Sequence, residues 1–134
     1  MPDKAFFDTN ILIYALAQHD RRTARAEQLL LGGGVISVQV LNEFTAVARR
    51  KLRMPWYDVK EALQSIRVLC PSPIPVTLAT HELALTIIDR YAFEIYDALI
   101  VATALKSKCN VLFSEDLQDG QVIDKRLTIR NPFL

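Results

Sequence analysis

The sequence lacks the features that would place it outside ordinary globular proteins. Only two cysteines, Cys70 and Cys109, occur in 134 residues, which excludes a disulfide framework or a zinc ribbon and predicts buried free thiols. The longest apolar run, over residues 11–17, is far shorter than the roughly 20 residues that cross a bilayer. With four glycines and no low-complexity tract, we expect one domain without membrane contact, in a reducing cytoplasm.

The chain also lacks an excess of charge of either sign. Sixteen lysines and arginines face 15 acids, for a net charge of +1, which excludes a nucleic-acid binder driven by total charge but leaves room for a local basic patch. The two histidines, His19 and His81, have no partners at the spacing of a metal site or a catalytic triad. We therefore assign them no role.

Short apolar runs alternate with longer segments of helical periodicity. Strands are predicted at 5–7, 35–36, 74–76, 111–113 and 127–129, and helices at about 11–17, 22–31, 38–53, 57–69, 78–91 and 97–108. Ser37 is a predicted helix cap, as are Thr9 and Asn10. The alternation indicates βαβ units, and hence an α/β fold with a mostly parallel sheet.

Two acids, Asp8 and Asp116, follow predicted strands directly or within three residues. In an open parallel sheet the carboxyl ends of the strands share one edge, and ligands bind along that edge. The topology is therefore expected to bring these two carboxylates together.

Two further acids lie on predicted helices. Glu43 falls beside the buried stripe near Val40 and Val47, and Asp97 lies at the start of a helix that is apolar on almost all sides. Taken alone, each acid has another explanation: Asp8 as a helix cap, Asp97 as a partner of a helix dipole, and the others as solvated or turn residues. Together, they would repel one another unless a cation neutralised them. An all-oxygen site favours Mg²⁺ or Mn²⁺ over zinc.

Four segments carry these acids in order along the chain. They read FFDTNILIYAL from Phe6, VLNEFTAVARRK from Val40, YDALIVATAL from Tyr96 and SEDLQDG from Ser114. Together they resemble the four acidic motifs of the PIN-domain ribonucleases, and above all the VapC-type toxins of bacterial type II toxin–antitoxin pairs. The resemblance covers nearly the whole chain, so that residues 1–134 would form a single PIN domain.

The resemblance implies a PIN-like three-layer α/β/α sandwich around a central, mostly parallel sheet of about five strands. It implies a Mg²⁺-dependent (or Mn²⁺-dependent) endoribonuclease that hydrolyses single-stranded or loop RNA with a metal-activated water and leaves 5′-phosphate and 3′-hydroxyl ends. It also implies a homodimer and a cognate VapB-like antitoxin that blocks the active site.

The resemblance extends to individual residues. Asp8, Glu43, Asp97 and Asp116 match the catalytic acids, with Asp8 and Asp97 as the principal metal ligands and Asp116 as a further one. Asp119 lies in the same loop and is an alternative to Asp116. Thr9 and Ser114 match small hydroxyl residues that support the acids or the phosphate, whereas Asn10 is interpreted as a helix cap.

An acidic site needs basic residues beside it to bind a polyanion. Arg49, Arg50 and Lys51 follow Glu43 along its helix, and Trp56 and Tyr57 come next as candidate base-stacking residues. The other interpretation is that these cations favour a helix C-terminus and that the aromatic rings belong to the core. A second basic group, Arg21, Arg22 and Arg25, is interpreted as a solvated helix face.

Three other functions compete with this one. A haloacid-dehalogenase-type phosphotransferase would need a second Asp where the chain has Asn10. A PIN-like domain that has lost catalysis would serve as an RNA- or protein-binding module, and a stand-alone PIN nuclease would act without an antitoxin. Retention of all four acids favours catalysis.

Overall fold

The structure, a computed structural model, describes residues 3–134. Along this range the chain forms β1 (Ala5–Phe7), α1 (Thr9–Leu16), α2 (Thr23–Leu31), α3 (Val38–Ala46), the π-helix η1 (Val47–Lys51), α4 (Trp56–Leu69), α5 (Leu78–Tyr91), α6 (Ile95–Lys106), β2 (Val111–Phe113), β3 (Val122–Ile123) and β4 (Leu127–Arg130). No helix in this range is both long and apolar enough to span a membrane.

The central sheet has four strands in the order β1-β2-β4-β3. β1, β2 and β4 are parallel, and the two-residue β3 is antiparallel to β4. In the β1–β2 pair, Phe7 is in register with Phe113, so both strands end at the same edge. The residues that follow Phe7 and Phe113 are therefore neighbours in space.

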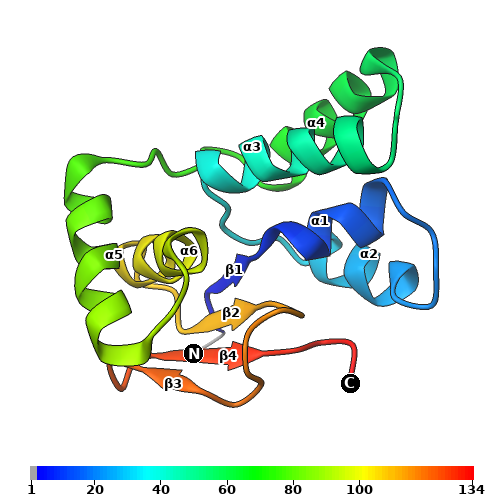
Figure 1. The fold of residues 1–134 in the computed structure, drawn as a ribbon. Coiled ribbons are helices and arrows are strands. Elements are labelled where there is room, and N and C mark those ends of the chain that lie inside the picture. The colour runs from blue at the N-terminus through cyan, green and yellow to red at the C-terminus, as the bar shows by residue number, and fades with distance from the viewer. Residues whose placement is uncertain (1–2) are drawn as a thin grey trace.

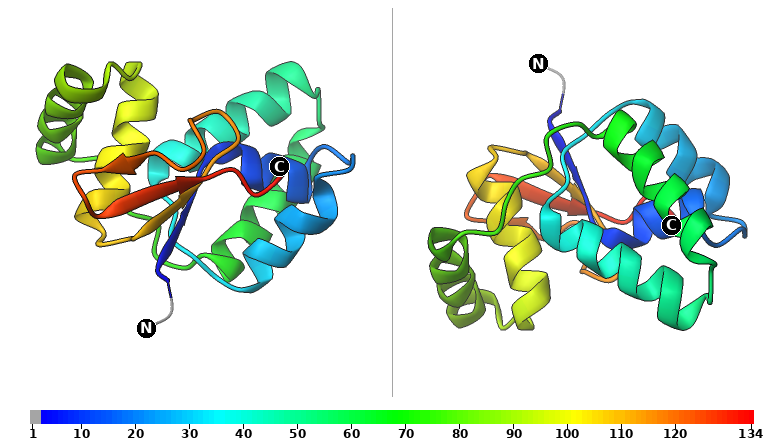
Figure 2. Two further views of the ribbon diagram at one scale, coloured as in Figure 1. Left: turned by 90° about the horizontal axis from the view of Figure 1, so that it is seen from below. Right: turned by 90° about the horizontal axis from the view of Figure 1, so that it is seen from above.

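Helices cover the sheet from several directions and complete an α/β/α sandwich. In Figure 1, α5 and α6 lie side by side at the left, α1 and α2 at the right, and α3 and α4 above. The two perpendicular views place the strands between the α5–α6 pair and the other four helices (Figure 2). Helix α6 is buried along most of its length, from Ala98 to Leu105, which explains why its sequence is apolar on almost all sides.

The core is built from the apolar stripes that the sequence predicts. Its largest fully buried side chains include Phe6, Leu12, Phe44, Ile100 and Leu112, and burial of such groups contributes roughly 1.5–3 kcal/mol each. Cys70 and Cys109 are free and buried, as predicted.

Gly34 is required by this core. A Cβ atom at that position would lie 2.4 Å from the ring of Phe7, closer than two carbon atoms can pack. The glycine thus allows the chain before Val35 to run directly alongside β1, where the N–H of Phe7 donates to the carbonyl of Val35.

The structure confirms the predicted fold class and corrects some of its elements. The expected strands at 35–36 and 74–76 are reduced to isolated bridges at Val35 and Ile74, so the sheet has four strands and not five. The short strand β3 was not predicted, because two residues carry no periodicity. Helix α6 begins two residues earlier than expected, because Glu94 accepts hydrogen bonds from the N–H groups of Tyr96 and Asp97.

Candidate active site

Asp8 lies directly after β1 and is 5% exposed. Its Oδ1 atom accepts a hydrogen bond from the N–H of Thr9 (2.7 Å) and caps α1, while Oδ2 accepts one from the hydroxyl of Ser114 (2.7 Å). Burial raises the pKa of Asp8 to about 7; the charges of Asp116 and Glu43 add to the increase, and the two hydrogen bonds oppose it. A carboxylate in this position is held at high electrostatic cost.

Ser114 joins the ends of β1 and β2. Besides donating to Asp8, its Oγ atom accepts hydrogen bonds from the N–H groups of Asp116 (3.2 Å) and Leu117 (3.3 Å). The segment after β2 therefore folds back over the serine. This local geometry brings Asp116 next to Asp8, as the strand-end positions predicted.

Glu43 reaches the same place from α3. Its two carboxylate oxygens accept hydrogen bonds from the hydroxyl of Thr9 (3.0 Å) and from the side-chain amide of Gln39 (2.9 Å). Thr9 thus supports one of the acids, the role that the resemblance implied for it.

Asp97 lies in the first turn of α6 and is half-buried. Its pKa is raised to about 6, first by burial and then by neighbouring carboxylates that include Glu43 and Asp116. The charges of Glu43 and Asp116 thus raise the pKa of both Asp8 and Asp97. Glu43 and Asp116 therefore lie close enough to Asp8 and Asp97 to affect both of them at this edge of the sheet.

A small cleft opens among these residues. It has a volume of about 230 Å³, and we call it the acid cleft; its walls include Thr9, Asn10, Tyr14, Glu43, Lys51 and Asp116. Asp8 and Asp97 are not among the residues that line it. Asp8 lies behind the cleft. It accepts a hydrogen bond from the N–H of Thr9, which lines the cleft, and another from the hydroxyl of Ser114.

The donor set fits a hard divalent cation. Within residues 3–134, no group of three His, Cys, Asp or Glu side chains converges closely enough to form a ready-made metal site. Mg²⁺ does not require one, because it commonly binds proteins through one or two carboxylates and keeps several waters. Burial and neighbouring carboxylates raise the pKa values of Asp8 and Asp97, and such an ion would stabilise the charged forms of these two side chains.

Asn10 does not cap α1, contrary to the prediction, because Asp8 already occupies the cap position. Its side chain bridges to the loop after β2: Nδ2 donates to Asp116 Oδ2 (3.1 Å), and Oδ1 accepts from the N–H of Glu115 (3.3 Å). The signal that could have indicated this role is the spacing of Asn10 and Tyr14, which are four residues apart on one face of α1. Tyr14 also contacts this loop, through Glu115.

The three acids of this loop have different surroundings. Asp116 lines the acid cleft, whereas Asp119 accepts a hydrogen bond from the N–H of Asn131 (2.8 Å) outside it. Glu115 pairs with Arg22. Of the two candidates for the fourth acid, Asp116 is the one at the cleft.

The basic residues after Glu43 divide between two faces. Lys51, at the end of η1, lines the acid cleft, whereas Arg49 and Arg50 line a separate hollow of about 290 Å³ with Trp56. In a regular α-helix a residue eight positions after Glu43 lies about 80° away around the axis. The wider π turn reduces this angle and carries Lys51 toward the face of Glu43.

Trp56 and Tyr57 are surface residues, which excludes the interpretation that they belong to the core. Their side chains are 50% and 71% exposed. The guanidinium of Arg49 lies over the Trp56 ring, 4.9 Å from its centroid, and donates to the carbonyl of Met54 (2.9 Å). An exposed aromatic ring beside cations is suited to stacking on nucleic-acid bases.

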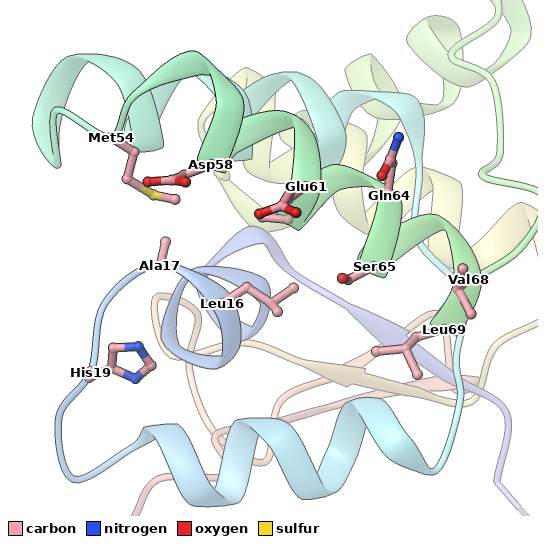
Figure 3. A pocket seen from close by; sticks show the side chains of 11 residues that line it. Leu16, Ala17, His19, Met54, Asp58, Glu61, Gln64, Ser65, Val68 and Leu69 are labelled. Atoms are coloured by element: carbon pink, nitrogen blue, oxygen red, sulfur yellow. The ribbon is translucent and has the colours of Figure 1, made fainter.

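A larger hollow lies next to the acid cleft, and we call it the α1–α4 groove. It has a volume of about 860 Å³ and runs between the end of α1, the loop after it and α4. Figure 3 shows Leu16 and His19 on one side and Asp58, Glu61 and Leu69 on the other. Gln18 lines the cleft and Ala17 the groove, so the two hollows adjoin along the chain.

Comparison with known proteins gives a family and a set of similar folds. The profile described as PIN domain matches residues 5–119. Among curated protein sequences, no match was found.

Several solved structures share the fold. A toxin–antitoxin complex from Klebsiella pneumoniae is 22% identical over 96% of this chain and 98% of its own, with a TM-score of 0.73. VapC20 from Mycobacterium tuberculosis, a toxin that cleaves the sarcin–ricin loop, is 21% identical over 84% and 92%, with a TM-score of 0.67. VapBC2 from Rickettsia felis, solved with a DNA fragment from its promoter, is 19% identical over 95% and 97%, also with a TM-score of 0.67.

Proposed function

This chain belongs to the PIN domain family, and from that premise we propose that it is a Mg²⁺- or Mn²⁺-dependent endoribonuclease and the toxin of a VapBC-type toxin–antitoxin pair. The observation that carries the proposal is the crowding of carboxylates at the carboxyl ends of β1 and β2. There, Glu43 and Asp116 raise the pKa values of both Asp8 and Asp97. Acids with perturbed pKa values beside a cleft are typical of functional sites.

In the proposed reaction, Asp8 and Asp97 hold the divalent cation, and Asp116 adds a further carboxylate. Mg²⁺ held there would lower the pKa of a bound water and would neutralise charge on a phosphate oxygen. Glu43 orients the attacking water and accepts its proton. The hydroxyl of Thr9 and the amide of Gln39 hold the Glu43 carboxylate in place for this role.

The RNA backbone is bound by the cations beside the acid cleft. We assign Lys51 to a phosphate next to the cleaved bond, because it lines the cleft. Arg49 and Arg50 lie on the adjoining face and suit flanking phosphates, with Trp56 as a stacking surface for a base. These contacts offset the repulsion between an acidic site and a polyanion.

The test uses the purified full chain and a labelled single-stranded RNA. Degradation is expected with Mg²⁺ or Mn²⁺, is expected to stop when EDTA removes the ion, and is expected to leave 5′-phosphate and 3′-hydroxyl ends. Absence of cleavage with either ion over a panel of unrelated RNAs would contradict the proposal and favour a catalytically inactive PIN-like binding module.

We further propose that the α1–α4 groove binds a cognate VapB-like antitoxin. Leu16 and Leu69 offer an apolar floor, and the exposed Asp58 and Glu61 favour a basic segment. A segment seated there reaches the adjoining acid cleft and blocks it. The similar structures include complexes of toxins with antitoxins. A small gene directly upstream that encodes a DNA-binding domain and a tail would support this role, and its absence would favour a stand-alone nuclease.

We also propose a homodimer. Leu78 and Leu85 are seven residues apart on α5 and are 73% and 47% exposed, and paired apolar residues on one helix face are typical of interfaces. Light scattering of the purified chain is expected to give twice the monomer mass, and a Leu78→Glu, Leu85→Glu variant is expected to be monomeric. A monomeric mass for the unaltered chain would contradict the proposal.

A further inference from the structure

Glu115 precedes Asp116 and is held by two side chains from distant parts of the sequence. Nη1 of Arg22 donates to both carboxylate oxygens, at 3.0 and 2.9 Å, and the hydroxyl of Tyr14 donates to Oε1 (2.5 Å). Arg22 and Glu115 are each only 22% exposed. This contact contradicts the prediction that Arg22 belongs to a solvated helix face.

Arg22 is itself fixed from two other directions. Its guanidinium lies 3.8 Å from the centroid of the Tyr14 ring, and Nη2 and Nε bond the carboxylate of Asp20 at 2.5 and 3.1 Å. Tyr14 packs its ring edge-on against Phe133. The arginine is therefore stacked, bonded on two sides and restricted to one position, unlike the freely moving partners of most surface ion pairs.

The main chain at Glu115 is held as well. Asn10 accepts the N–H of Glu115 and donates to the Asp116 carboxylate. Helix α1 thus binds this segment through Asn10 at its main chain and through Tyr14 at the Glu115 side chain. Ser114 is also held, by its hydrogen bond to Asp8. The two residues that precede Asp116, Ser114 and Glu115, are therefore both fixed, and they fix the position of Asp116.

We infer that Arg22 and Glu115 are positioning residues that hold Asp116 at the acid cleft in the geometry needed to bind a divalent cation. This inference rests on the proposed function. Arg22 neither lines the cleft nor bonds Asp116; it acts through Glu115 and through the ring of Tyr14, which lines the cleft. The ion pair also explains why Glu115, an acid adjacent to Asp116, does not line the cleft.

The sign of the change in cation affinity on substitution of Arg22 shows whether this residue acts by positioning Asp116 or by its charge. Replacing Arg22 with Gln removes a positive charge near the acids, which by Coulomb attraction alone would strengthen cation binding. If Arg22 positions Asp116, the same substitution weakens it. Changes in residues that orient metal ligands typically cost about 10- to 100-fold in affinity, so we expect a loss of about tenfold.

The experiment titrates Mn²⁺ alone into purified protein by calorimetry. The Arg22→Gln variant is expected to bind Mn²⁺ about tenfold more weakly, and Arg22→Lys, which keeps the charge without the two-sided geometry, is expected to fall in between. Arg25→Gln is the matched control, because Arg25 bonds only Gln28 on its own helix. It is expected to bind Mn²⁺ like the unaltered chain.

Two further measurements keep the inference open to contradiction. Glu115→Gln preserves the side-chain shape and serves if Arg22→Gln does not fold, as judged by circular dichroism. Because it removes a negative charge, its loss of Mn²⁺ affinity supports positioning only if it exceeds the loss in Asp119→Asn, which neutralises a carboxylate of the same loop outside the cleft. A variant of either kind that folds, melts at a lower temperature and binds Mn²⁺ with unchanged affinity would reduce the pair to a structural role. If the unaltered chain binds Mn²⁺ but cleaves no RNA, the proposed function fails while this test stands; if it binds no Mn²⁺, both fail.

Discussion

The acid cleft and the α1–α4 groove adjoin each other, yet they have little in common. The groove is larger, at about 860 Å³ against 230 Å³, and its acids, Asp58 and Glu61, are exposed. The cleft is bordered by hydrogen-bonded carboxylates, and Asp8 behind it is buried.

The comparison shows that the volume of a hollow does not indicate whether the acids beside it have perturbed pKa values. In the groove, the carboxylates of Asp58 and Glu61 are exposed to solvent. At the strand ends beside the cleft, burial raises the pKa of Asp8 to about 7, and the charges of Asp116 and Glu43 add to the increase. The reactive site is therefore expected at the smaller hollow.

The largest expected effect is the loss of activity when one of the two principal acids beside the cleft is neutralised. Asp8→Asn and Asp97→Asn each remove a proposed metal ligand while keeping the side-chain size. We expect the rate of RNA cleavage to fall at least about 1,000-fold, because activation of water depends on the bound cation. Initial rates on a labelled RNA at saturating Mg²⁺ measure the effect.

Glu61→Gln is the matched control in the groove. It also replaces one carboxylate by an amide, and its rate is expected to stay within about twofold of the unaltered chain, because exposed groups away from a site rarely affect it. Equal losses in Glu61→Gln and Asp8→Asn would remove the distinction between the two hollows.

The second effect concerns stability and pH in the metal-free protein. The folded-state pKa of Asp8, about 7, lies above its ordinary value of 3.8, so the folded state binds the proton more tightly. Asp8 alone is therefore expected to lower the free energy of unfolding as the pH rises from 4 to 7, by at most about 4 kcal/mol at about 1.4 kcal/mol per pKa unit. Asp97, whose pKa is raised to about 6, adds to the decrease.

Urea denaturation with EDTA at pH 5 and pH 8 measures this dependence. Asp8→Asn is expected to flatten it, and Mg²⁺ is expected to restore stability to the unaltered chain at pH 8. Because Asp8 also caps α1 through the N–H of Thr9, a large loss of stability in Asp8→Asn at both pH values would instead show that its main contribution is the cap.

The third effect concerns the partner proposed for the groove. Reversing its charge with Asp58→Lys and Glu61→Lys is expected to weaken binding of the antitoxin encoded by the adjacent gene at least about tenfold, since like charges across an interface are unfavourable. RNA cleavage by the variant alone is expected to be unchanged. Its inhibition should then require more antitoxin; unchanged inhibition would place the antitoxin elsewhere.

Much of the fold could be predicted from local patterns. The apolar stripe around Val40 and Phe44 and the run from Ala98 to Val101 defined α3 and α6, because burial acts through residue periodicity. The sequence could not show that residues 35–36 form an isolated bridge and not a strand. The number of residues that pair there depends on how closely the chain can approach β1 next to Phe7, which is a tertiary contact.

The acids of the candidate site could be found from the sequence, but their partners could not. Strand ends and helix faces indicated Asp8 and Asp116, whereas the partner of the adjacent Glu115 is Arg22, which lies 93 residues away along the chain. Likewise, Lys51 reaches the cleft through a π turn, which no apolar pattern predicts. Contacts of this kind depend on tertiary packing.

The smallest expected effect is at Asp119, an acid that belongs to neither hollow. Its carboxylate accepts the N–H of Asn131 at 2.8 Å, and loss of such an exposed hydrogen bond costs about 0.5–1.5 kcal/mol. Asp119→Ala is therefore expected to lower the free energy of unfolding by about 1 kcal/mol and to leave the rate of RNA cleavage within about twofold. Asp116→Ala, three residues earlier in the same loop, is the comparison, because it removes a carboxylate that lines the cleft. If Asp119→Ala reduced the rate as strongly as Asp116→Ala, a place at the acid cleft would not be what distinguishes Asp116 from Asp119.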